Sequence, residues 1–281
     1  MKRRSFFKLG SLAALGSTLV NPIDTFAGNN DISLNSTNKK AKNIIFMVSD
    51  GMSSGTLNLA NMYSNRILGK NSNWLQLYID NKVSRGIMDM ASASSIVTDS
   101  AAASSSWGGG ARVNNGSLNI SPSGEENLPI WQKFKLKGKK AGCVTTVPIT
   151  HATPAGFTVA IKSRNDQSAI AEEYLRIGYD VLLGGGQKYF AAEHRKDKKD
   201  MFTAFAQQNY LVAKTKSDLK NTDKSKKLLG VFDFDALPYQ IDRKQSAELT
   251  NTIPTLAEMT EVAINQMKDH KEGFVLQVES G

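Results

Sequence analysis

Ser100 lies in the segment Val97-Thr-Asp-Ser-Ala-Ala-Ala103, in which small residues follow an Asp-Ser pair. Asp and Ser are favoured as helix N-caps, so the segment predicts a loop that opens into a helix capped by Asp99 or Ser100. At such a start, free backbone N–H groups and the positive end of the helix dipole stabilise an alkoxide or a bound phosphate. Ser100 is therefore a candidate nucleophile, although capping alone explains the same residues.

The serine has no evident base among the histidines. The chain holds only His151, His194 and His270, and none is near Ser100 in the sequence. A Ser-His-Asp triad therefore has little support. A bound metal ion is the other common means of activating a hydroxyl, which directs attention to groups that hold a divalent cation.

Oxygen-bearing side chains follow three apolar runs. Asp50 follows residues 43–48, the segment Thr150–Thr153 follows 141–147, and Glu279 follows 273–278. In a parallel sheet, active sites form beyond the carboxyl ends of the strands. Carboxylates and hydroxyls brought together there suit a hard divalent cation, whereas each residue by itself fits a turn or a cap.

These positions depend on elements that the apolar pattern predicts. Continuous apolar runs indicate strands buried on both faces at residues 43–48, 141–147, 180–183 and 273–278. Helical patterns cover residues 56–68, 128–137, 168–176 and 254–268, the last with a proline in its first turn. The alternation predicts an α/β fold with a mostly parallel central sheet and helices on both faces. Residues 191–253 are more polar and irregular, and we expect them to leave the main sheet.

Composition excludes some classes of function. The 281 residues carry a formal charge of +9, but acidic residues interrupt the basic stretches 194–200 and 214–227. This pattern fits a solvated face and not a nucleic-acid surface, which favours a cleaner basic stripe with aromatics. The single cysteine, Cys143, rules out an intramolecular disulfide and a CxxC site, and we expect it to be a small buried hydrophobe.

Residues 1–27 are typical of an export signal. The segment Lys2-Arg-Arg-Ser-Phe-Phe-Lys8 precedes an apolar run at 9–20 and a cleavage-like Thr25-Phe-Ala27. The arginine pair resembles a twin-arginine signal, with the general secretory route as the alternative. Residues 28–40 are predicted to be a flexible polar lead-in. We expect a periplasmic or extracellular protein without stable membrane insertion, since no apolar run reaches about 18 residues.

Several separated motifs resemble the alkaline phosphatase family, in the family's order and over residues 42–281. The matching segments are Asn43-Ile-Ile-Phe-Met-Val-Ser-Asp-Gly-Met52, 97–103, 108–116, Thr145-Thr-Val-Pro-Ile-Thr-His-Ala-Thr-Pro-Ala-Gly156, 163–165, 180–190, 228–233 and Gly273-Phe-Val-Leu-Gln-Val-Glu279. A single Asp-Ser-Ala-Ala match would be weak, whereas this series is specific. The resemblance implies an alkaline phosphatase-like sheet and hydrolysis of small phosphate monoesters.

The resemblance also implies roles for individual residues. Ser100 would attack phosphorus and form a phosphoserine, and Arg164 would bind two phosphate oxygens through its planar fork. The implied cofactors are Zn²⁺ and Mg²⁺. Asp50 would bridge the two ions, and the magnesium site would be completed by Thr153 and Glu279.

Two further residues would support this site. His151 would lie close to the magnesium without binding it. Asp99 would orient Arg164 through a salt bridge. Family members also commonly form homodimers, which we expect only of a full-length chain.

The chain departs from the family pattern after Glu279. Family members take most of their zinc ligands from a later segment, and only Asp50 would remain for zinc here. We therefore expect an incomplete or interrupted coding sequence, a sheet incomplete at its C-terminal side, and neither tight zinc binding nor useful turnover by this chain.

Two other functions remain open. One is a phosphodiesterase or sulfatase of the same superfamily, although many of these phosphodiesterases use threonine and the sulfatases a modified cysteine where this chain has Ser100. The other is a non-catalytic exported protein that binds phosphate or a metal.

Overall fold

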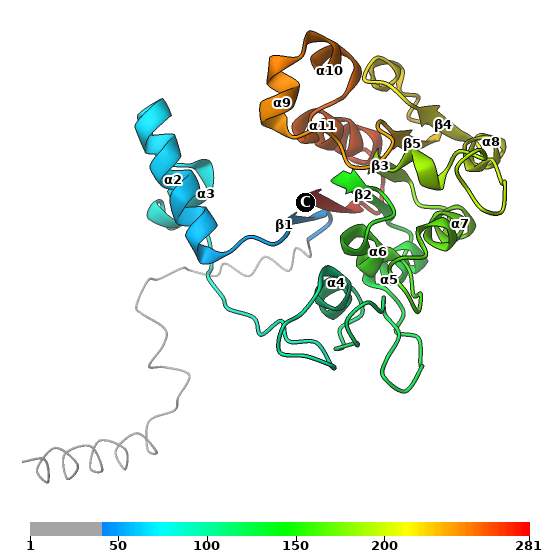
Figure 1. Ribbon diagram of the computed structural model, residues 1–281, viewed down its shortest axis with the longest axis horizontal. Helices are drawn as coiled ribbons and strands as arrows, with labels where there is room; N and C mark the ends of the chain where they lie inside the picture. Colours follow the sequence, from blue (N-terminus) through cyan, green and yellow to red (C-terminus); the bar gives the residue numbers. More distant parts are fainter. Residues whose placement is uncertain (1–40) are drawn as a thin grey trace, which may run out of the picture. The chain divides into compact units, whose positions relative to one another are not determined.

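Six strands, all parallel to their neighbours, form one sheet in the order β1-β6-β2-β3-β5-β4 (Figure 1). The computed structural model describes residues 41–281, so the predicted signal (1–27) and lead-in (28–40) lie outside the described residues. The strands are β1 (Ile44–Ser49), β2 (Lys140–Pro148), β3 (Val181–Gly185), β4 (Tyr210–Ala213), β5 (Lys227–Val231) and β6 (Phe274–Ser280). The predicted α/β class is confirmed.

The helices connect and cover these strands. They are α2 (Ser54–Leu68), α3 (Asn73–Ile79), α4 (Ser100–Gly108), α5 (Ile130–Leu136), α6 (Ala152–Thr158), α7 (Gln167–Ile177), α8 (Met201–Gln207), α9 (Gln240–Gln245), α10 (Ala247–Thr252) and α11 (Leu256–Met267), with short 3-10 turns η1 (Gln187–Tyr189) and η2 (Asp218–Asn221). The sequence pattern missed α3, α6, α8, α9 and α10. It also placed Pro254 inside the last helix, whereas α11 begins after its N-cap Thr255, which forms a capping box with Glu258.

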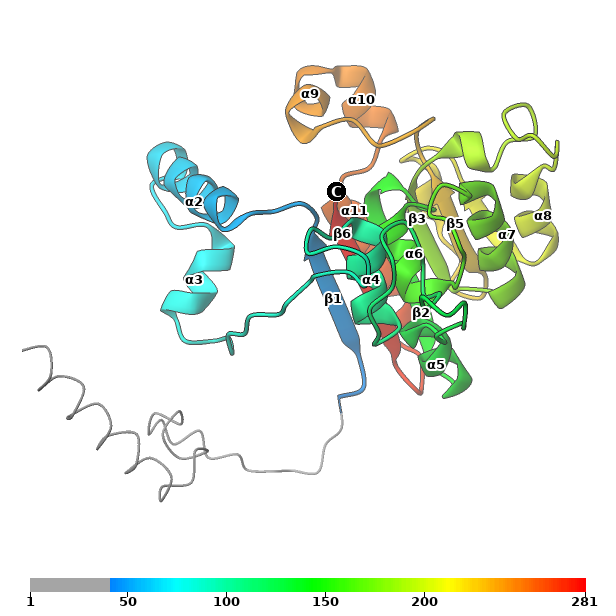
Figure 2. The same ribbon diagram turned by 60° about the horizontal axis from the view of Figure 1, so that its bottom comes forward.

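Alternation of side chains along the strands gives the sheet two apolar faces. On β6, Val275 faces a core built with α4 to α8, while Phe274 and Leu276 face a core built with α11 (Figure 2). Cys143 of β2 lies in the first core with no exposed surface, and burial raises the pKa of its thiol. The cysteine is therefore a small core residue, as predicted.

The expectation that residues 191–253 leave the main sheet is wrong for β4 and β5. Strand β5 pairs with β3, and β4 pairs with β5, so both continue the sheet on one side. Leu228 and Leu229 of β5 are fully buried. The polar character of the segment belongs to the turns and helices around two short strands, and it conceals their apolar pattern.

β1 forms the other edge of the sheet, where the side chains of Ile45 and Met47 are 43% and 75% exposed.

Among residues 41–281, no helix combines the length and the apolar character needed to cross a bilayer.

Helices α4 and α6 pack closely because glycines lie at their contact. A Cβ atom on Gly108 would overlap the carbonyl of Gly156, and a Cβ on Gly156 would overlap the side chain of Ser104. Next to this contact, Phe157 of α6 packs on Phe46 of β1 with ring centroids 4.9 Å apart. The two glycines therefore set how closely α4 approaches α6 and the sheet beneath them.

We expect Gly156→Ala to destabilise the protein by about 2 kcal/mol, because overpacking typically costs about 1–3 kcal/mol. Gly55→Ala is the matched control, since a Cβ at Gly55 in α2 meets only Ser53 Oγ at 3.5 Å. There the higher helix propensity of alanine should stabilise by up to about 1 kcal/mol. Urea unfolding of both variants tests this. Equal stability of Gly156→Ala and the parent protein would contradict the close-packing argument.

Candidate active site

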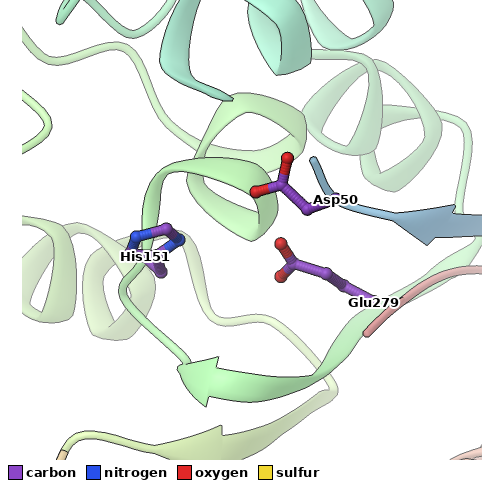
Figure 3. Close-up of side chains that lie close together, drawn as sticks. All are labelled: Asp50, His151 and Glu279. Carbon is purple, nitrogen blue, oxygen red and sulfur yellow. The ribbon is translucent and has the colours of Figure 1, made fainter. Parts of the chain in front are cut away.

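Asp50, His151 and Glu279 converge at the carboxyl ends of β1, β2 and β6 (Figure 3). Asp50 follows β1 directly, and its backbone N–H donates to the carbonyl of Ser280 at 3.0 Å. His151 follows β2 and precedes α6. Glu279 lies within β6, since that strand runs to Ser280, and not after it as the sequence pattern indicated. The parallel strands therefore gather three residues that are distant in the sequence.

Ser100 is the first residue of α4 and faces Asp50. The Asp99 side chain caps the helix by accepting from the Ala102 N–H at 2.9 Å, which leaves Ser100 in the first turn. The Ser100 hydroxyl donates to Asp50 Oδ2 at 2.8 Å. The predicted loop-to-helix segment thus carries the serine to the end of β1, with its oxygen at the positive end of the helix dipole.

Arg164 is held at both ends of its guanidinium group. Nη1 lies 3.1 Å from Asp99 Oδ2, and Nη2 lies 3.0 Å from His151 Nε2. Asp99 Oδ2 also accepts from the Gly116 N–H at 3.0 Å. The ion pair predicted between Asp99 and Arg164 is present, and it joins the cap of the serine helix to the arginine.

The His151 imidazole is hydrogen-bonded to Arg164. Burial lowers the pKa of His151, and the positive charge of Arg164 lowers it further, while the carboxylates of Asp50 and Asp235 oppose the shift. The imidazole is therefore neutral. Because arginine only donates, His151 Nε2 accepts and the ring proton lies on Nδ1, a buried atom without a partner in the described structure.

Glu279 is a fully buried carboxyl group at the centre of the site. Burial raises its pKa to about 7, the nearby hydroxyls of Thr145 and Thr153 oppose this shift, and the charge of Asp50 adds to it. Oε2 accepts from the Thr145 hydroxyl at 2.6 Å, whereas Oε1 is buried without a hydrogen-bond partner in the described structure.

The residues present fit a bound cation. One ligand atom from each of Asp50, His151 and Glu279 lies within 4.8 Å of the others, and Thr153 Oγ1 is 3.4 Å from Asp50 Oδ2. Two carboxylates that face each other in a buried place repel, and a partnerless buried oxygen is costly, so a cation would relieve both. Oxygen ligands of this kind suit Mg²⁺. This is the one such cluster of three within residues 41–281.

The structure brings all seven predicted site residues together, and it adds contacts that the sequence did not reveal. Thr145 reads as an ordinary strand residue, but β2 places it beside Glu279. Gly116 ends the family-matching segment 108–116, and its N–H donates to Asp99 Oδ2. No sequence signal marks Thr145, because strand register is not readable from one sequence. Among the other histidines, His194 packs edge-on against Phe234 and His270 lies near the carbonyl of Gly273.

Comparison with known proteins identifies similar chains. The model of the alkaline phosphatase family matches residues 41–281. The chain is 37% identical over 190 residues to alkaline phosphatase 3 of Bacillus subtilis (strain 168), which covers 65% of this chain and 38% of that protein. It is 30% identical over 244 residues to alkaline phosphatase 4 of the same organism, which covers 85% of this chain and 50% of that protein.

The solved structures that resemble this chain include alkaline phosphatases. The crystal structure of Thermus thermophilus alkaline phosphatase is similar with a TM-score of 0.79 and 37% identity, over 86% of this chain and 50% of that one. The enzyme from the psychrophile Shewanella sp. is similar with a TM-score of 0.71 and 28% identity, over 84% and 56%. This chain spans about half the length of most of these relatives. With its family model matched over residues 41–281, the chain belongs to the alkaline phosphatase family.

Proposed function

We propose that this chain contributes the nucleophile and the phosphate-binding arginine for hydrolysis of small phosphate monoesters. The observation that carries the proposal is the Ser100 hydroxyl at the start of α4, directed at Asp50 in the same site as Arg164. Membership of the alkaline phosphatase family supports this reaction class.

In this proposal, Ser100 Oγ loses its proton and forms a bond to phosphorus while the ester bond breaks, and the departing alkoxide takes up a proton and leaves as the alcohol. Water then attacks phosphorus and breaks the bond to Ser100 Oγ, which regains a proton as inorganic phosphate is released. The N–H groups in the first turn of α4 and the Arg164 guanidinium bind the phosphoryl oxygens. Asp99 and His151 hold Arg164, so its orientation is established before a substrate arrives.

The same site is proposed to hold metal ions. Asp50, Thr153 and Glu279 would bind Mg²⁺, Asp50 would also bind Zn²⁺, and His151 would lie beside the magnesium. Bound metal ions supply charge neutralisation and activation of the serine hydroxyl. Because Asp50 is the one proposed zinc ligand among the described residues, we expect weak zinc binding.

Location and assembly are proposed from the sequence. The export signal at 1–27 would deliver the protein to the periplasm or the cell exterior, where small phosphate monoesters are the substrates. A homodimer is proposed only for a full-length protein. The serine at position 100 favours monoesterase over diesterase or sulfatase activity.

A second candidate function is non-catalytic binding of phosphate and Mg²⁺ by the same residues. One observation favours it. Among residues 41–281, the only group of three or more potential metal-ligating His, Cys, Asp or Glu side chains is Asp50, His151 and Glu279, whereas in-line displacement commonly uses two metal ions.

We expect the chain to hydrolyse an aryl phosphate slowly with Mg²⁺ and Zn²⁺ present, well below the about 10 s⁻¹ that is typical of enzymes. Ser100→Ala should abolish this turnover, because it removes the attacking oxygen. Peptide mass spectrometry after an acid quench should find a phosphoryl group on Ser100.

Ser106→Ala is the matched control, since Ser106 is also in α4 but its hydroxyl donates to the Ala102 carbonyl. Its turnover should equal that of the parent chain. Equal turnover by Ser100→Ala would overturn the proposal. Phosphate binding without any turnover would support the second candidate.

Arg164→Ala should weaken the binding of inorganic phosphate by about 10- to 100-fold, since hydrogen bonds to charged groups contribute about 1.5–3 kcal/mol. The phosphate affinity of Arg164→Lys should lie between those of the parent chain and Arg164→Ala, because a lysine keeps the charge but cannot form the bidentate contact. Isothermal titration calorimetry measures both. Arg176→Ala removes an exposed arginine paired with Glu173 on α7 and should leave the affinity unchanged. An unchanged affinity in Arg164→Ala would place the phosphate elsewhere.

A further inference from the structure

Thr145 lies beside Glu279 because of strand register. β2 and β6 are parallel neighbours, and Thr145 is paired with Glu279 across them. Both residues are fully buried. Paired residues on adjacent strands direct their side chains to the same face of the sheet, so the Thr145 hydroxyl and the Glu279 carboxylate meet below α4 and α6.

The direction of the hydrogen bond between them is determined by a third group. The Val147 N–H donates to Thr145 Oγ1 at 3.1 Å, and the Thr145 hydroxyl donates to Glu279 Oε2 at 2.6 Å. Because the hydroxyl accepts from the backbone, its own proton is directed at the carboxylate. The pairing of β2 with β3 shifts register between Val144 and Pro148, so this contact lies in an irregular part of the strand, as is common next to active sites.

The Thr145 side chain is also held by its packing. A Cβ atom on Gly184 of β3 would lie 2.9 Å from Thr145 Cγ2, so the methyl group fills the space over that glycine. The γ carbon is thus placed against β3 and the γ oxygen toward β6. A residue with this contact on one side and a bond to a carboxylate on the other has little freedom to rotate.

The two oxygens of Glu279 therefore have different environments. Oε2 is taken by Thr145, and Oε1 is buried without a hydrogen-bond partner in the described structure. Asp50 and Thr153, the other two proposed magnesium residues, lie in the same site. Second-shell bonds of this type orient a ligand and tune its affinity.

We infer that Thr145 is a positioning residue that holds the Glu279 carboxylate in the orientation in which it would bind Mg²⁺, which rests on the metal site of the proposed function. Thr145 itself touches neither substrate nor metal. Its effect is exerted through the orientation and charge of the Glu279 carboxylate.

The test is calorimetric titration of the purified chain with Mg²⁺ alone, without substrate. The parent chain should bind one equivalent. Thr145→Val keeps the shape but removes the donor, and it should weaken Mg²⁺ binding by about 10- to 100-fold, as is typical of second-shell changes. Thr145→Ser keeps the hydroxyl and should restore most of the affinity. Thr145→Ala provides the same test if the valine variant does not fold.

Thr158→Val is the matched control. Thr158 is also fully buried, but its hydroxyl donates to backbone carbonyls within α6. The Thr158→Val variant should have a lower melting temperature, measured without Mg²⁺, but should bind Mg²⁺ with the affinity of the parent chain. A Thr145→Val chain that binds Mg²⁺ as the parent does would overturn the inference and leave the metal site intact. A parent chain without Mg²⁺ binding would overturn the metal site and this inference with it.

Discussion

The carboxylate of Glu279 lies buried between β1 and β2, where water cannot solvate its charge. The neighbouring groups of the site surround this poorly solvated carboxylate. Thr145 donates to one oxygen of Glu279, Asp50 lies nearby at the end of β1, and Thr153 of α6 lies 3.4 Å from Asp50 Oδ2. Such a place is poorly suited to two unpaired carboxylates and well suited to a cation. The chemistry proposed here follows from that requirement.

The serine reaches this carboxylate pair through helix packing. α4 lies on α6 at Gly108 and Gly156, and α6 also carries Thr153. These glycines have no side chains, so the two helices can approach closely. The distance between Ser100 and Asp50 therefore depends on residues that perform no chemistry. The aromatic rings of Phe46 and Phe157 tie the same helix to β1. Ser100 and the proposed metal residues are therefore parts of one packed unit.

Asp99 connects the start of α4 to Arg164, the proposed phosphate-binding residue. One of its oxygens caps α4, and the other pairs with Arg164 and accepts from Gly116. The residue that begins the serine helix thus also orients the arginine. His151 holds the second guanidinium nitrogen and stays neutral because it is buried next to a positive charge. Serine and arginine are consequently placed by a shared set of contacts.

The sequence alone determined the α/β class and four of the six strands, because buried strands are continuous apolar runs. Polar groups at the ends of these runs indicated Asp50 and Glu279 as candidates, whereas Arg164, Asp99 and His151 were proposed from the family resemblance. The sequence did not reveal that β4 and β5 continue the sheet, since two short strands lie among polar turns. It also missed α6, whose residues resemble a turn. Thr145 could not be found, because its role depends on which strand lies beside β2 and in what register. Tertiary structure decided these points: pairing between distant strands joins residues that share no local pattern in the sequence.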